Sequence, residues 1–253
     1  MQPTNEIKKI KEMKKNIFLV FMLLCMGSSF AQVSFNVSAD LQSRYVWRGQ
    51  ALGGNAPCFE PGANIGYKGL SFGVWGAYSL NSTEYQELDW SLSYSFLDEM
   101  FTIMVTDYSF PSYSSAFHYF NYDANTTNHV IEGGIVFKVP STHLSLSLYT
   151  NLYGADARTI DDELVYSTYA ELAYELECSK INTTFNFVAG CAINGKENYS
   201  FYGNDGLGIV NLGITATHAL EITPSFSLPI YAQVIANPVD NKMYLVGGAH
   251  IEL

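Results

Sequence analysis

The residues of this sequence that are best able to do chemistry are charged side chains within otherwise apolar segments. In these segments, apolar or aromatic residues alternate with Ser, Thr, Asn or Gly, and the charges occupy the polar positions. Fixed charges that line a common water-filled space select the ions that pass through it. We therefore interpret these residues, together with Asp40, as candidate pore-lining groups. The set is Arg44, Arg48, Glu60, Asp89, Glu132, Lys138, Glu171 and Glu175.

The elements that must position these charges are β-strands. The odd positions of Val33–Leu41 and the even positions of Leu88–Phe96 are apolar, and the positions between them are mostly polar. Successive side chains of a strand point to opposite faces, so each segment has one apolar and one polar face. The pattern recurs about twelve times with no convincing helix between, which is typical of a transmembrane β-barrel. We predict an all-β fold: an antiparallel barrel of about 12 strands with lipid outside and a polar lumen.

The connections between these segments alternate in length. Short ones are predicted at Lys68-Gly69, Leu97–Met100, Pro140–Thr142, Glu177–Lys180 and His218–Thr223. Long ones are predicted at Gly49–Pro57, Asn81–Gln86, Pro111–Asn128, Ala155–Asp162, Gly195–Gly206 and Asn237–Lys242. Bacterial barrels have short periplasmic turns and long extracellular loops. The alternation therefore predicts an even number of strands, with both ends of the barrel on the periplasmic side.

The first 31 residues have the pattern of a secretory signal peptide. Lys14 and Lys15 precede the apolar run Ile17–Met26, and the small residues Ser29 and Ala31 then form a cleavage site. We predict a signal peptide over residues 1–31 and a barrel over residues 32–253, exported to the outer membrane of a Gram-negative bacterium. Outer-membrane lipid and lipopolysaccharide are then the expected surroundings.

The charge balance limits the partners. Without residues 1–31 the chain has 8 basic and 22 acidic side chains, a net charge of −14. Nucleic acid is not an expected partner because phosphate binding needs a basic surface; small solutes or cations are. The three remaining cysteines, Cys58, Cys178 and Cys191, have no repeating spacing, so neither a disulfide framework nor a metal site is indicated. No cofactor is expected.

The candidate charges suggest a cluster inside the barrel mouth. Arg44 and Arg48 lie near the outer end of the first strand, and Glu60 starts the second strand across the same hairpin. We expect Glu60 or Asp89 to pair with the arginines, which leaves the other carboxylates to set the field in the lumen. Such a cluster either forms a selective constriction or only neutralises buried charge. The carboxylates left unpaired are Glu132, Glu171 and Glu175.

Two further features stay open at this point. The third long loop, Pro111–Asn128, is rich in aromatic residues, which either fold inward as a constriction or lie at the lipid headgroups. Some barrels also carry an Asp-His or Ser-His site at the lipid-facing rim, and His118, His129 and His218 are available for one. No local catalytic motif supports an enzyme.

The N-terminal third of the barrel resembles the TorF-type porin family of outer-membrane proteins. The family has a first strand that ends in a Tyr-Val-aromatic-Arg-Gly run and a second hairpin that ends in Gly-Val-Trp. The matching segments here are Ser43–Gln50, Glu60–Gly62, Gly69–Gly76 and Glu87–Trp90. The resemblance implies a porin-like barrel and names no cargo.

Together these observations predict a porin-like outer-membrane barrel that allows passive, cation-preferring passage of small solutes. The alternatives are a non-conducting structural or surface barrel and an outer-membrane barrel enzyme of the lipase or protease type. Twelve strands enclose a lumen between that of eight-stranded barrels, which side chains fill, and that of sixteen-stranded porins. The expected lumen is therefore narrow or partly occluded.

Overall fold

The computed structural model describes residues 33–81, 85–111, 118–195 and 200–253. The chain divides into two compact units, Met1–Val33 and Ser34–Leu253. The signal peptide predicted over residues 1–31 lies outside the described residues. The second unit contains the barrel.

Twelve antiparallel strands of the described chain close into one barrel, which confirms the predicted fold and strand number. Each strand pairs with its neighbour in sequence, and β1 closes the barrel between β14 and β4. The barrel strands are β1 (Val33–Gln42), β4 (Cys58–Tyr67), β5 (Leu70–Ser79), β6 (Gln86–Phe96), β7 (Phe101–Ser109), β8 (His129–Lys138), β9 (Leu144–Gly154), β10 (Thr168–Cys178), β11 (Thr183–Ala192), β12 (Gly208–Thr223), β13 (Phe226–Asn237) and β14 (Lys242–Glu252). Two short strands, β2 (Val46–Trp47) and β3 (Gln50–Ala51), form a separate hairpin.

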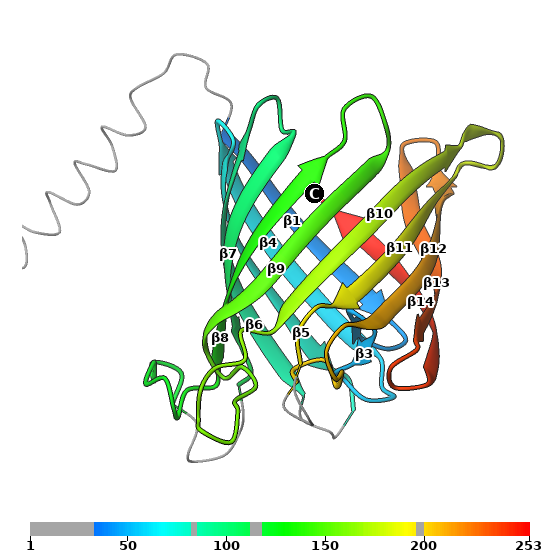
Figure 1. Cartoon of the computed structure of the whole chain (residues 1–253). Helices are drawn as coiled ribbons and strands as arrows, with labels where there is room; N and C mark the ends of the chain where they lie inside the picture. Colours follow the sequence, from blue (N-terminus) through cyan, green and yellow to red (C-terminus); the bar gives the residue numbers. More distant parts are fainter. Residues whose placement is uncertain (1–32, 82–84, 112–117, 196–199) are drawn as a thin grey trace, which may run out of the picture. The chain divides into compact units, whose positions relative to one another are not determined.

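The long connections gather at one end of the barrel and the short turns at the other (Figure 1). One predicted turn is wrong: His218–Thr223 belongs to β12, and the chain reverses between Thr223 and Phe226. The physical reason is that the apolar phase continues through Leu220 and Ile222, both exposed on the outer face. The described turn after β10 contains a 3-10 helix, η1 (Ser179–Ile181), which is followed by Asn182 in the left-handed conformation.

The two faces of the strands differ as the alternation predicts. Val33, Phe35 and Leu41 of β1 are exposed on the outer face, whereas Asp40 and Gln42 point inward. Five tyrosines at or near strand ends are also exposed. A closed barrel leaves no unpaired strand edge in lipid, so every strand hydrogen bonds along both sides. Those tyrosines are Tyr67, Tyr78, Tyr94, Tyr166 and Tyr174.

Among the described residues, we find no helix with both the length and the hydropathy needed to cross a membrane.

The buried apolar residues lie inside the barrel rather than outside it. They form three small clusters, one around Tyr169 and Val210, one around Tyr45 and Cys58, and one around Val246. Each cluster includes residues of the segment between β1 and β4. This segment therefore fills part of the lumen.

Candidate functional site

The site begins with loop 1, residues 43–57, which connects β1 to β4. Its centre is the hairpin of β2 and β3, in which Trp47 pairs with Gln50 across a two-residue turn. Both turn residues, Arg48 and Gly49, have positive φ angles, 47° and 78°. Positive angles at both positions match the right-handed twist of a tight hairpin. The conformation costs a non-glycine residue such as Arg48 about 1–2 kcal/mol, so other contacts must hold it.

The tip of loop 1 contacts the part of the barrel wall formed by β12 and β13. Gly49 packs so closely on β12 that a Cβ atom would lie 1.9 Å from the carbonyl oxygen of Val210. The side chain of Asn237 on β13 donates a hydrogen bond to the Gly49 carbonyl at 3.1 Å. Gln50 donates to the carbonyl of Phe201 at 3.2 Å. Loop 1 therefore extends into the lumen and packs on β12 and β13, and only glycine fits at position 49.

Arg48 fastens this loop to a third wall, β8. Its two terminal nitrogens donate to the two carboxylate oxygens of Glu132 at 2.5 and 2.9 Å. The side chains are 9% and 2% exposed, so the pair is nearly dry. Glu132 accepts a further hydrogen bond from the Tyr108 hydroxyl at 2.9 Å. Because the geometry is bidentate and the remaining acceptor is satisfied, this pair meets the conditions under which a buried ion pair offsets its desolvation.

Aromatic rings complete the surroundings of the Arg48 guanidinium. Its carbon lies 4.3 Å from the centres of the Trp47 and Tyr149 rings and 4.7 Å from that of Tyr169. Each such contact in a desolvated setting contributes up to about 2 kcal/mol. We call Arg48, Glu132 and these three rings the Arg48 latch.

Loop 5, of which residues 193–195 and 200–207 are described, supplies the last part of the constriction. Tyr202 is buried, stacks on Trp47 with ring centres 6.1 Å apart, and accepts a hydrogen bond from Arg48 at 2.7 Å. Burial raises the pKa of the Tyr202 phenol to about 12, although the charge of Arg48 acts to lower it. The phenol thus stays neutral, and loops 1 and 5 meet over the lumen.

The sequence-based pairing of the arginines is wrong. Arg48 pairs with Glu132 rather than with Glu60 or Asp89, and Arg44 lies over the ring of Tyr244 at 5.6 Å. The reason is the direction of the β2–β3 hairpin, which carries Arg48 away from the neighbouring β4 and across the lumen.

The other predicted pore residues have different surroundings. Glu60 accepts a hydrogen bond from Gln42. Asp89 faces the backbone of Ser109 at 3.4 Å. Glu171 accepts from the Tyr169 hydroxyl at 2.5 Å, and Glu175 is exposed in the periplasmic half of β10. Lys138 lies at the periplasmic end of β8, 3.6 Å from Glu99 and 61% exposed, and so belongs to the rim.

Loop 3, residues 110–128, does not form the constriction in its described part, residues 118–128. Tyr119 and Tyr122 pack on the ring of His129, which belongs to the outward phase of β8. The nitrogens of His129 lie 2.7 Å from a carboxylate oxygen of Asp107 and 2.7 Å from the Tyr119 carbonyl oxygen. Both ring nitrogens of His129 are therefore engaged, one by β7 and one by the backbone of loop 3. Loop 3 is thus fastened to the outer wall.

This Asp107-His129 pair is the kind of rim pair that a barrel enzyme would need. Its second nitrogen is engaged by the loop backbone, however, and within the described residues the buried Ser109 hydroxyl opposite His129 has no hydrogen-bond partner. Nucleophilic catalysis needs a hydrogen bond between nucleophile and base. The observed geometry favours a structural clamp.

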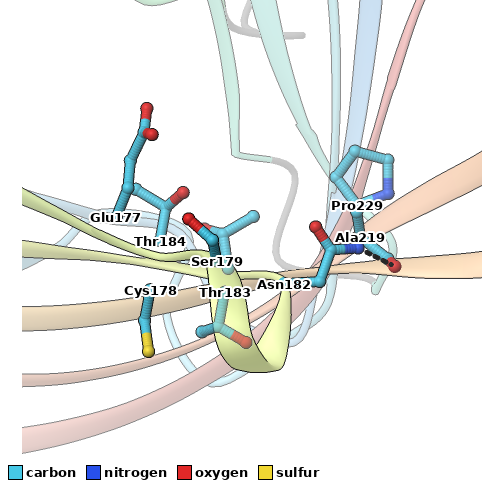
Figure 2. A pocket seen from close by; sticks show the side chains of 9 residues that line it. Glu177, Cys178, Ser179, Asn182, Thr183, Thr184, Ala219 and Pro229 are labelled. Carbon is cyan, nitrogen blue, oxygen red and sulfur yellow. Dashed lines mark hydrogen bonds between the residues drawn. The ribbon is translucent and has the colours of Figure 1, made fainter.

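The periplasmic mouth contains a second polar region. A cavity of about 390 Å³ lies beside the turn between β10 and β11. Figure 2 shows Glu177 and Thr184 on one side of the turn and Cys178 on the opposite side, as the alternation requires. Asn182 donates to the carbonyl of Ala219 at 3.1 Å and joins the turn to β12. Glu177 thus adds a carboxylate to the mouth.

Sequence reasoning missed the aromatic part of the latch. Tyr149 and Tyr169 were not among the predicted pore residues, although Tyr169 lies in the same phase as Glu171 on one strand. An aromatic residue in the polar phase of a strand is the signal that identifies such positions, because the lipid face is on the other side.

The known proteins that this chain resembles are outer-membrane barrels. No known family matches the sequence, and no curated protein matches it either. Among solved structures, the KdgM porin has 8% identity and a TM-score of 0.49, with 86% of this chain and 97% of that chain covered. An outer-membrane channel from Pseudomonas putida F1 has 11% identity and a TM-score of 0.42, with 89% and 96% covered. OmpF of Salmonella typhi has 7% identity and a TM-score of 0.38, with 88% and 98% covered.

At these identities the likeness concerns the fold alone. The chain is an outer-membrane β-barrel. Its closed sheet of twelve strands, its exposed apolar outer face and its polar lumen agree with one another on this point.

Proposed function

We propose that this barrel is a porin-like channel for the passive passage of small solutes, with a preference for cations and a constriction made by loop 1. The observation that carries the proposal is the charge balance of the lumen. The inward arginine at the constriction, Arg48, is neutralised by Glu132, whereas several inward carboxylates have no ion pair with a basic side chain in the described chain. These are Glu60, Glu87, Asp89, Glu171 and Glu175.

Unpaired carboxylates in a narrow lumen attract cations and repel anions. The walls have a low dielectric constant, so the field is focused along the axis. The effect falls in concentrated salt, since the screening length shrinks to about 3 Å at 1 M. The preference should therefore be strongest in dilute salt.

The test is a reversal-potential measurement on the purified protein in a planar bilayer with a KCl gradient. We expect cation preference in dilute salt, and a weaker preference for the double variant Glu171→Gln/Glu175→Gln. Lys138→Gln at the exposed rim serves as the control and should leave the preference nearly unchanged. Anion preference of the unmodified protein in dilute salt would refute the proposal.

A non-conducting barrel is the second candidate, and the Arg48 latch favours it. Loops 1 and 5 fill much of the extracellular half of the lumen with buried side chains. A barrel that stays closed under all voltages, and conducts only when the latch is broken, would support this alternative.

The resemblance to TorF-type porins and the export of the chain belong to the same proposal. The Tyr-Val-aromatic-Arg-Gly run coincides with Tyr45–Gly49, which forms the inward hairpin and the latch. The motif would then mark a constriction. We also propose that residues 1–31 are a cleaved signal peptide, which N-terminal sequencing of the mature protein would test.

A further inference from the structure

A second luminal feature is a cavity of about 470 Å³ between loop 1 and the walls formed by β1, β4, β12, β13 and β14. Its volume lies in the range of small-molecule sites. Its lining combines the carboxyl groups of Asp40 and Glu60, the polar side chains of Thr215 and Gln233, and the aromatic side chains of Tyr45 and Tyr231.

The two carboxylates of this cavity differ in whether a basic side chain lies beside them. Asp40 lies 2.9 Å from a ring nitrogen of His250, whose other nitrogen lies 3.5 Å from Glu252. His250 thus gives Asp40 a basic partner. Glu60 is 7% exposed, and its hydrogen-bond donor is the neutral amide of Gln42. In the described chain no basic side chain forms an ion pair with Glu60.

The wall opposite Glu60 can bind a polar body but supplies no further charge. Thr215 and Gln233 are cross-strand partners and offer neutral donors and acceptors. Tyr231 donates to Gln42 at 3.4 Å and presents its ring to the cavity. A buried carboxylate without a cation, facing neutral hydrogen-bonding groups across a cavity of this size, is complementary to a charged donor group on a polar molecule.

We propose that this cavity binds a small organic cation, with its ammonium group at Glu60 and its hydrogen-bonding body against Thr215, Gln233 and Tyr231. An inorganic ion would use the carboxylate and leave the opposite wall unused. The proposal deepens the proposed channel function by naming the class of solute. Binding at the site nevertheless does not require that the pore conduct.

The test is isothermal titration calorimetry on the full-length barrel in detergent, with D-glucosamine and D-glucose as the probes. The two sugars differ in one amine, which a neutral buffer keeps largely protonated; acidic buffer is avoided because it would protonate Glu60. We expect glucosamine to bind with an affinity about tenfold or more above that of glucose. Glu60→Gln keeps the shape and the contact with Gln42, and should remove this difference. Glu99→Gln, which removes an exposed carboxylate outside the cavity and outside the inward set, should preserve it.

Equal binding of the two sugars, no binding of either, or unchanged glucosamine binding by Glu60→Gln would each overturn the site. Heat-modifiable migration on a gel checks that each variant is folded. The two proposals fail separately. Binding that depends on Glu60 in a barrel without conductance would refute the channel alone, whereas cation-selective conductance without such binding would refute the site alone.

Discussion

Replacement of Arg48 by methionine should open loop 1. The change keeps the length of the side chain but leaves Glu132 buried, at 2% exposure, without its cation. Breaking one side of a buried ion pair costs about 3–5 kcal/mol. The barrel can avoid most of this cost by releasing loop 1 and hydrating Glu132. The fraction of barrels with loop 1 released should therefore rise by roughly two to three powers of ten.

Cys58 provides an assay of loop 1 that is independent of conductance. It is fully buried and packs with Tyr45 of loop 1. In a background that carries Cys178→Ser and Cys191→Ser, the rate at which a maleimide labels Cys58 should rise with the released fraction, that is, by roughly two to three powers of ten. Single-channel conductance should rise in the same variant.

Two controls isolate the ion pair. Lys138→Met breaks an exposed contact with Glu99 and should leave labelling nearly unchanged, because such surface pairs contribute about 0–1 kcal/mol. The double variant Arg48→Met/Glu132→Leu removes both charges and should label far more slowly than Arg48→Met. Equal labelling rates for Arg48→Met and Lys138→Met would refute the assignment of the latch.

Three further changes test other parts of the structure. Gly49→Ala places a Cβ atom against Val210 in a backbone conformation that alanine rarely adopts, so Cys58 labelling should rise there too, although no charge is altered. His129→Ala removes the hydrogen bond to the Tyr119 carbonyl and the ring contacts with Tyr119 and Tyr122, so protease treatment of intact cells should cut loop 3 faster than in the wild type, whereas His218→Ala should have no such effect. Val37→Arg on the lipid face should destabilise the barrel by about 2–4 kcal/mol in a reversible folding assay, and Ser38→Arg far less; equal costs would contradict the phase assignment.

In loop 3, the structure distinguishes between two possible roles of the aromatic residues. Its aromatic residues suit a constriction or a headgroup anchor equally well in the sequence. In the structure, burial and the hydrogen bond to Asp107 raise the pKa of the Tyr122 hydroxyl to about 12, so it remains a donor and ties the loop to the outer wall. Phe120 is 88% exposed beside it. The side chain of His129 holds loop 3 in this position. Its partners, Asp107 and Tyr119, lie 22 and 10 positions away along the chain, so the sequence pattern around His129 does not reveal them.

The strands were predictable because period-two alternation is a local property. One face of every strand meets lipid, so the phase of each inward charge follows from its immediate neighbours. The pairing of those charges was not predictable. Arg48 and Glu132 are 84 positions apart, and the turn at Arg48 and Gly49 aims the arginine across the lumen rather than along the wall. Proximity in sequence favoured Glu60, but the contact depends on the direction of a hairpin that only the folded barrel fixes.

The Arg48 latch also allows two properties of the pore, its conductance and its ion preference, to be changed separately. Because Gly49→Ala displaces loop 1 without removing a charged side chain, it changes the packing of the lumen but not its net charge. Such a variant should change conductance through packing and leave ion preference nearly constant. Glu171→Gln/Glu175→Gln removes two negative charges without touching Arg48, so it should change preference more than conductance. A parallel change of both properties in both variants would show that one constriction sets selectivity and opening together.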